Sequence, residues 1–74
     1  MAFTEVTADE LDTRFTYHSP KGDQNERYIK LRGYAKELAY QIKELSPGSR
    51  EQSLALTSLE EAIFWANAAI ARRE

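Results

Sequence analysis

Three flat side-chain rings lie within four residues of one another, at Phe15, Tyr17 and His18, and Lys21 follows them. Rings of this kind stack on nucleobases, and each stacked base contributes ~1–3 kcal/mol in complexes with single strands. The same residues also suit a packing role, in which Phe15 and Tyr17 hold this segment against the rest of the chain. The segment is therefore either a base-binding platform or a structural arm.

Basic side chains suited to phosphate contacts occur in the segment that follows the rings. They are Arg27, Lys30, Arg32 and Lys36. A base platform beside phosphate-binding cations fits a nucleotide. On a helix, however, Arg32 and Lys36 can equally belong to a solvent-facing side. Arg72 and Arg73 can simply place cations at the negative end of a helix dipole.

The sequence offers no recognisable catalytic or metal-binding set. Adjacent helical residues point about 100° apart, so Glu60 and Glu61 do not converge on one atom. His18 has no serine or acid at an identifiable partner spacing, and no Walker loop or dinucleotide glycine fingerprint occurs. The absence of cysteine and the single histidine argue against thiolate and zinc sites. We therefore expect no enzymatic activity, no metal and no cofactor.

Length and charge narrow the possibilities further. The chain has 74 residues, which allows one domain, 1–74, with a small core. The net charge of -2 argues against bulk binding to DNA or RNA, although a local basic cluster can still hold a small anion. No apolar run approaches the ~20 residues of a membrane span, and Met1–Glu10 lacks a signal-peptide core. We expect no membrane or DNA partner and a cytoplasmic location.

Capping patterns predict three helical segments. Thr7 with Glu10 has capping-box spacing, which favours a short helix over about Thr7–Arg14. This helix and an extended arm, in which Pro20 disfavours helix at the residue before it, make up residues 1–20. Asp23 with Glu26 predicts the start of a long helix over 23–45, and Ser49 with Gln52 that of a second over 49–73.

A short break separates the two long helices. Ser46-Pro47-Gly48 ends the first and turns the chain, because proline cannot continue a helix and glycine readily takes a positive φ. Two long helices joined by so short a loop lie antiparallel. The fold class that we predict is all-α: an antiparallel helical hairpin preceded by a short N-terminal helix and an extended arm.

The apolar residues exceed what one hairpin can cover. The first long helix carries one heptad seam: Tyr28, Leu31, Ala35, Leu38, Ile42 and Leu45. The second carries one seam (Leu56, Leu59, Ile63, Ala66, Ile70) and a further stripe (Leu54, Ala55, Ala62, Trp65, Ala69). A helix that is apolar on several sides is buried on several sides. We therefore expect a homo-oligomer, with Trp65 packed in the interface and Asn67 in an interhelical hydrogen bond.

One family matches these residues. The second long helix carries the pattern S-R-E-x-S-L-A-x-T-x-L-E-E-A-x-x-W-A-N-A, and Tyr17-His18-Ser19-Pro20-Lys21-Gly22-Asp23-Gln24 lies upstream. Over roughly Phe15–Arg72 the chain resembles the phage anti-CBASS sponge family, the second type of anti-CBASS protein. The resemblance implies a protein that sequesters cyclic oligonucleotide messengers, such as cyclic GMP-AMP, in the host bacterial cytoplasm. It also implies immune evasion by a bacteriophage, through binding and not hydrolysis.

The same resemblance implies an assembly and a set of ligand contacts. Members form hexamers of helical hairpins, with cyclic dinucleotides bound between two protomers and cyclic trinucleotides at a separate threefold site. Tyr17 matches the aromatic residue that stacks on a base, and Arg32 matches the basic residue that contacts phosphate, with Lys30 or Lys36 as alternatives. Arg72 matches the arginine that contacts a trinucleotide. The further candidates, from proximity alone, are Phe15, His18 and Lys21.

Two other functions fit the sequence. The first is a helical-hairpin interaction module with no small ligand, in which Tyr17 and Arg32 have no role in activity. The second is a sponge for a cyclic ADP-ribose messenger, because a related hairpin occurs in the anti-Thoeris sponges.

Overall fold

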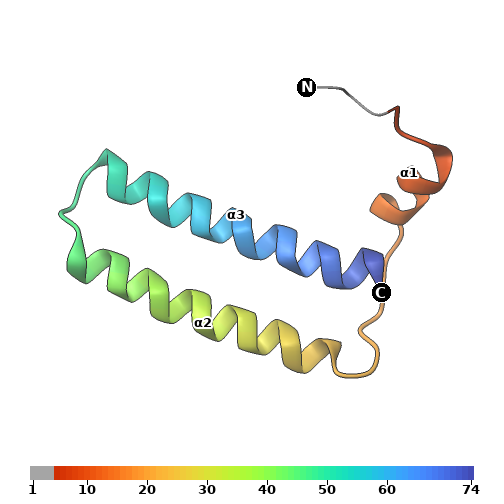
Figure 1. Cartoon of the computed structure of the whole chain (residues 1–74), viewed down its shortest axis with the longest axis horizontal. Helices are drawn as coiled ribbons and strands as arrows, with labels where there is room; N and C mark the ends of the chain where they lie inside the picture. Colours follow the sequence, from red (N-terminus) through yellow and green to blue (C-terminus); the bar gives the residue numbers. More distant parts are fainter. Residues whose placement is uncertain (1–4) are drawn as a thin grey trace.

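The computed structural model describes residues 5–74, which form three helices and no strand (Figure 1). They are α1 (Ala8–Phe15), α2 (Gln24–Leu45) and α3 (Arg50–Arg73). Helices α2 and α3 lie side by side as an antiparallel hairpin, and α1 lies beyond its open end, beside the last turn of α3 (Figure 1). The predicted all-α hairpin is confirmed, while residues 1–4 of the predicted N-terminal segment lie outside the described residues.

Two of the three helix starts use the hydroxyl caps that the sequence predicts. The Oγ1 of Thr7 accepts a hydrogen bond from the backbone N–H of Glu10, at 3.1 Å. The Oγ of Ser49 accepts one from the backbone N–H of Gln52, also at 3.1 Å. Each hydroxyl satisfies one of the backbone donors that a helix leaves unpaired at its first turn.

The predicted capping box at Asp23 is wrong. The side chain of Asp23 makes no cap hydrogen bond, and its backbone (φ -90, ψ 11) is not extended as at the other two caps. Its carboxylate instead accepts a hydrogen bond from the Nε of Arg27, one turn into α2, at 3.2 Å. The carboxylate of Asp23 therefore pairs with a cation and does not cap the helix.

The side chain of Gln52 closes the loop between the two long helices. Its Nε2 donates to the backbone carbonyl of Ser46 at 2.8 Å and also lies 3.3 Å from that of Lys43. These carbonyls belong to the end of α2, where a helix leaves acceptors unpaired. One amide therefore ties the start of α3 to the end of α2.

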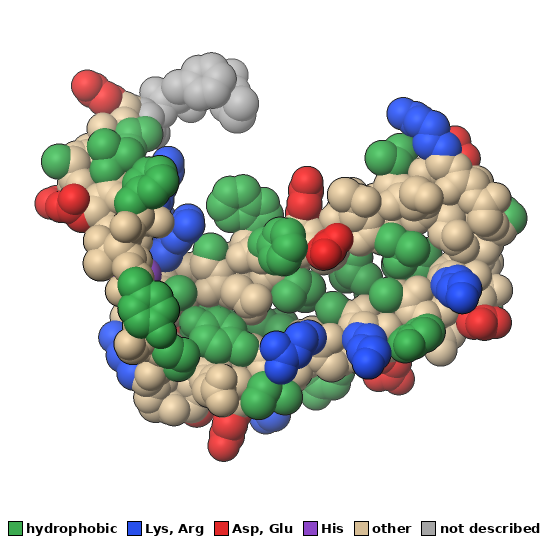
Figure 2. Space-filling model, turned by 180° about the vertical axis from the view of Figure 1, so that it is seen from behind, with side chains coloured by type: hydrophobic (Ala, Val, Ile, Leu, Met, Phe, Trp, Pro, Cys, Tyr) green, Lys and Arg blue, Asp and Glu red, His purple; other side chains and the backbone are tan. Residues whose placement is uncertain are grey.

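The hairpin has no closed apolar core within the described residues. The facing seams, which include Leu31, Ile42, Leu59 and Ile63, are only half-buried. The chain is 17 Å thick, and its radius of gyration is 15.8 Å, against about 11 Å for a compact chain of this length. Apolar side chains face solvent along both long helices (Figure 2), and Trp65 is 69% exposed. One layer of helices has room on both sides for further packing.

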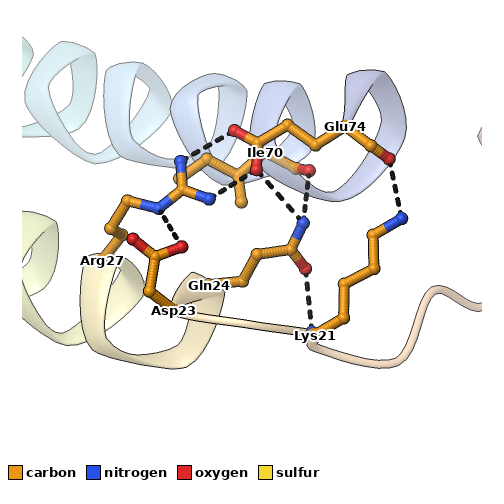
Figure 3. Close-up of polar contacts among 6 residues, drawn as sticks. All are labelled: Lys21, Asp23, Gln24, Arg27, Ile70 and Glu74. Atoms are coloured by element: carbon orange, nitrogen blue, oxygen red, sulfur yellow. Dashed lines mark hydrogen bonds and ion pairs between the residues drawn. The ribbon is translucent and has the colours of Figure 1, made fainter.

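The open end of the hairpin is held by a polar clamp around Gln24 (Figure 3). Gln24 is 3% exposed and is the only buried residue of the described range. Its Oε1 accepts from the N–H of Lys21 at 3.1 Å, and its Nε2 donates to the carbonyl of Ile70 at 3.2 Å. The carboxylate of Glu74 accepts a hydrogen bond from the same Nε2 at 3.3 Å and two more from the guanidinium of Arg27. The backbone carbonyl of Glu74 accepts a hydrogen bond from the Nζ of Lys21.

We predict that Gln24→Ala lowers the melting temperature measured by circular dichroism at a fixed protein concentration. The substitution removes three hydrogen bonds from a buried side chain and should cost about 1–2 kcal/mol, or roughly 5–10 °C for a chain of this size. Gln41→Ala is the matched control, because Gln41 is exposed on the same helix. Equal melting temperatures for the two variants would show that the clamp contributes nothing to stability.

Candidate functional site

Helix α1 is attached to the end of α3 through one carboxylate. The Oε2 and Oε1 of Glu10 accept hydrogen bonds from the two terminal nitrogens of Arg73, at 2.9 and 2.6 Å. The Nε of Arg14, one turn further along α1, also donates to Oε1 at 3.1 Å. The Nε2 of His18 lies 2.8 Å from the carbonyl oxygen of Thr13, and this contact folds the following segment back against α1.

This attachment creates a hollow of about 580 Å³, which we name the arm hollow, between α1, residues 16–18 and the hairpin. Its lining residues come from all three helices and from the segment that follows α1. They are Arg14, Thr16, Tyr17, His18, Asn25, Tyr28, Arg32, Phe64, Asn67, Ala68, Ala71 and Arg72. The lining holds three arginines, a histidine and three aromatic rings but no carboxylate, although the whole chain carries a net charge of -2.

Four of the predicted site residues meet in the arm hollow: Tyr17, His18, Arg32 and Arg72. Tyr17 is 82% exposed, so its ring is not packed onto the hairpin of its own chain. Within residues 5–74, neither Arg32 nor Arg72 takes part in an ion pair. The hollow therefore combines an accessible aromatic ring with two guanidinium groups that have no acidic partner within the described chain.

The other predicted residues lie elsewhere. Phe15 is 85% exposed at the end of α1 and does not line the hollow. Lys21 belongs to the polar clamp, where its Nζ donates to the carbonyl of Glu74 at 2.9 Å. Lys36 lines a second hollow of about 530 Å³, the mid-hairpin groove, and Lys30 lines neither.

The mid-hairpin groove adjoins the arm hollow but differs in chemistry. It runs between α2 and α3, with Leu56, Leu59 and Ile63 among its mostly apolar lining. Its charged lining residues are Arg32, Lys36 and Glu60. Because a carboxylate lies among its cations, this groove suits an anion less well than the arm hollow does. Arg32 lines both spaces.

Sequence reasoning missed several residues of the arm hollow. The heptad spacing places Tyr28 in the hairpin seam, and no sequence pattern indicates a role for Arg14. The hydrogen bond predicted for Asn67 at an interface between chains stays a prediction, and within the described chain its buried Oδ1 has no hydrogen-bond partner. Asn67 lines both the arm hollow and the mid-hairpin groove. The sequence signal that could have indicated these residues is their closeness to predicted site residues. Arg14 lies three residues before Tyr17, and Asn67 lies five residues before Arg72.

Two carboxylates near the open end of the hairpin, Glu10 and Glu74, are already paired with arginines. Hydrogen bonds from Arg73, and then from Arg14, lower the pKa of Glu10 from 4.5 to about 2. Hydrogen bonds from Arg27, and then from Gln24, lower the pKa of Glu74 to about 2. Both carboxylates stay ionised at neutral pH and face their arginines, which leaves the arm hollow cationic.

The family of the chain follows from a match that includes most of these elements. Residues 7–71 match the family model of the Acb2/Tad1 hairpin domain. The chain belongs to this family. The match confirms the resemblance to the anti-CBASS sponges and takes in α1 as well as α2 and nearly all of α3. Comparisons with curated proteins and with solved structures give no match.

Two further features of this Acb2/Tad1 hairpin concern membrane spans and metal sites. No described helix is long and apolar enough to span a membrane. Within residues 5–74, no three histidine, aspartate or glutamate side chains gather as a metal site requires.

We predict that the Glu10 attachment weakens in acid. The folded-state pKa of Glu10 lies below its ordinary value, so its stabilising effect is complete above about pH 4.5 and is lost as the pH falls towards 2. Thermal melts of Glu10→Gln should therefore change less between pH 5 and pH 2 than those of the wild type. Glu37→Gln, which alters an exposed residue of α2, serves as the control and should keep the wild-type pH dependence. Identical pH profiles for wild type and Glu10→Gln would contradict this role.

Proposed function

We propose that this protein binds cyclic dinucleotide messengers, and cyclic trinucleotides as well, and holds them away from CBASS antiphage effectors without hydrolysing them. The observation that carries the proposal is the arm hollow. The chain is acidic overall, yet the lining of this hollow holds three arginines and an exposed tyrosine and no carboxylate. Membership of the Acb2/Tad1 family supports the same function.

The lining residues match the two halves of a nucleotide. Tyr17 offers an open ring face for a base, and Arg32 offers a planar guanidinium fork that suits a phosphate. Stacking contributes ~1–3 kcal/mol per base, and a charge-assisted hydrogen bond contributes about 1.5–3 kcal/mol. A nanomolar dissociation constant needs about -12 kcal/mol. Two stacked bases and several phosphate contacts supply a gross interaction energy of this size, from which the entropic cost of association is subtracted.

A single chain supplies only half of these contacts, so the proposal includes assembly. The accessible surface of the chain is 6325 Å², against about 4,700 Å² for a folded monomeric protein of this mass. Exposed apolar residues such as Leu54, Phe64 and Trp65 are available to pack between chains. In a two-fold arrangement each protomer provides one Tyr17 and one Arg32 to a symmetric ligand. The family resemblance favours a hexamer built as a trimer of dimers.

Arg72 is the proposed contact for a trinucleotide. Within one chain it lines the same hollow as Tyr17 and Arg32. A trinucleotide site distinct from the dinucleotide site therefore depends on several copies of Arg72 meeting at a symmetry axis of the assembly.

The family name joins two kinds of hairpin protein, so membership does not by itself select the messenger. A cyclic ADP-ribose messenger also presents a base and phosphates, and the arm hollow suits this chemistry too. Binding experiments with both ligand classes distinguish the two functions, and failure with both would favour an interaction module.

We predict that calorimetric titration with 3′,3′-cyclic GMP-AMP gives tight binding with one ligand per two chains. Tyr17→Ala and Arg32→Ala should each weaken binding by about tenfold or more, because each removes a contact that symmetry repeats. Tyr40→Ala and Arg50→Ala are the matched controls, since neither residue lines a hollow described above.

The complex is then heated and its supernatant analysed by chromatography. Recovery of unchanged cyclic GMP-AMP supports sequestration, and recovery of a linear product would show catalysis. If no heat is released with this ligand, cyclic trinucleotides and cyclic ADP-ribose messengers are titrated next. Unchanged binding in Tyr17→Ala and Arg32→Ala, or an equal loss in the control variants, would show that the assignment of these two residues is wrong.

We predict that Trp65→Asp reduces the mass of the assembly in sedimentation velocity experiments. A carboxylate in place of this exposed indole on α3 would be buried at an apolar interface without a partner. Ser58→Asp adds the same charge to an exposed position of α3 and should leave the mass unchanged. A wild-type protein that sediments as an 8.5 kDa monomer would contradict the proposed assembly.

A further inference from the structure

Arg14 occupies a place in the arm hollow that neither the motifs nor the family resemblance assigned to a ligand contact. It lies in the last turn of α1, its side chain is 44% exposed, and it lines the hollow together with Arg32 of α2 and Arg72 of α3. Each of the three helices therefore contributes one arginine to the lining of the same space.

The hydrogen bonds of Glu10 determine which part of Arg14 remains available. Each carboxylate oxygen of Glu10 accepts a hydrogen bond from one terminal nitrogen of Arg73. Arg14 reaches the same carboxylate only through its Nε, at 3.1 Å. Within the described chain no hydrogen bond involves the two terminal nitrogens of Arg14. Arg14 is therefore held in orientation at its Nε, while its terminal N–H groups remain able to bind another acceptor.

The charges around Arg14 favour an anionic acceptor. Glu10 does not line the hollow, and its charge is shared with Arg73. Arg32 and Arg72 line the same hollow without acidic partners among residues 5–74. Glu10 offsets only part of the charge of Arg14, so the three arginines around this space still repel one another, and a bound phosphate relieves that repulsion.

We propose that Arg14 is a third phosphate-binding residue of the arm hollow, so that α1 is a wall of the ligand site and not only a cover for the hairpin. This inference rests on the proposed function, because it assumes that the hollow holds a cyclic oligonucleotide. The attachment of Glu10 to Arg73 then acts to position α1, and Arg14 contacts the ligand.

The test is a double-mutant cycle measured by calorimetric titration with 3′,3′-cyclic GMP-AMP. The four proteins are wild type, Arg14→Gln, Glu10→Gln and the double variant, and Arg50→Gln is the control for net charge. We expect Arg14→Gln to weaken binding roughly tenfold and Arg50→Gln to leave it unchanged. Because Glu10 also holds α1 against α3, Glu10→Gln should lower affinity as well, and the double variant shows how far the two losses are additive.

The salt dependence of binding provides a second readout. Raising the salt concentration from 50 to 500 mM should weaken binding less in Arg14→Gln than in the wild type, because one charge contact has been removed. Circular dichroism shows whether α1 and the hairpin remain folded in each variant. Arg14→Lys keeps the charge without the guanidinium fork, so we expect an affinity between those of wild type and Arg14→Gln.

The outcomes separate this inference from the proposed function. Failure of the wild-type protein to bind any cyclic oligonucleotide would overturn both. Tight wild-type binding that Arg14→Gln leaves unchanged would overturn the role of Arg14 alone.

Discussion

A pair of helices can cover only one stripe on each partner, and this constraint governs the rest of the structure. The stripe on α2 meets one stripe of α3, and the described residues still contain no fully buried apolar side chain. Trp65 and Leu54 remain in solvent on the other sides of α3. Hydrophobic burial is the main favourable contribution to folding, so a chain with so little of it depends on polar contacts at its ends, and the assembly proposed above would cover its sides.

The two ends of the hairpin are fastened by the same kind of group. Gln52 ties the loop end through backbone carbonyls of α2, and Gln24 ties the open end through a backbone carbonyl of α3 and the carboxylate of Glu74. A neutral amide carries both donors and an acceptor, so it can join elements without the desolvation cost of a charge. The charged side chains stay at the surface, where Arg27 and Arg73 pair with carboxylates and Arg32 does not.

Short-range patterns in the sequence predicted the hairpin well. Pro47 and Gly48 marked the turn, and the heptad seam and the Ser49 cap located the long helices, because these signals act over a few residues. That Tyr17 and Arg32 belong to one site is what the family resemblance implies, and both line the arm hollow. Contacts between distant segments have no short-range sequence pattern that predicts them. The pairing of Glu10 with Arg73 and the clamp of Gln24 on Glu74 depend on how α1 and the arm fold back against the hairpin. For the same reason Lys21 was expected at the ligand and lies instead against α3.

The attachment of α1 also has a consequence for the order of folding. The hairpin closes across a loop of a few residues, whereas the bond between Glu10 and Arg73 joins positions 63 residues apart. Local contacts form early, and contacts distant in sequence carry a larger entropic cost of loop closure. The hairpin is therefore expected to form first and α1 to dock onto its finished end. Arg14 and Tyr17 come to lie beside Arg72 only in that last step. The arm hollow is therefore expected to form after the hairpin.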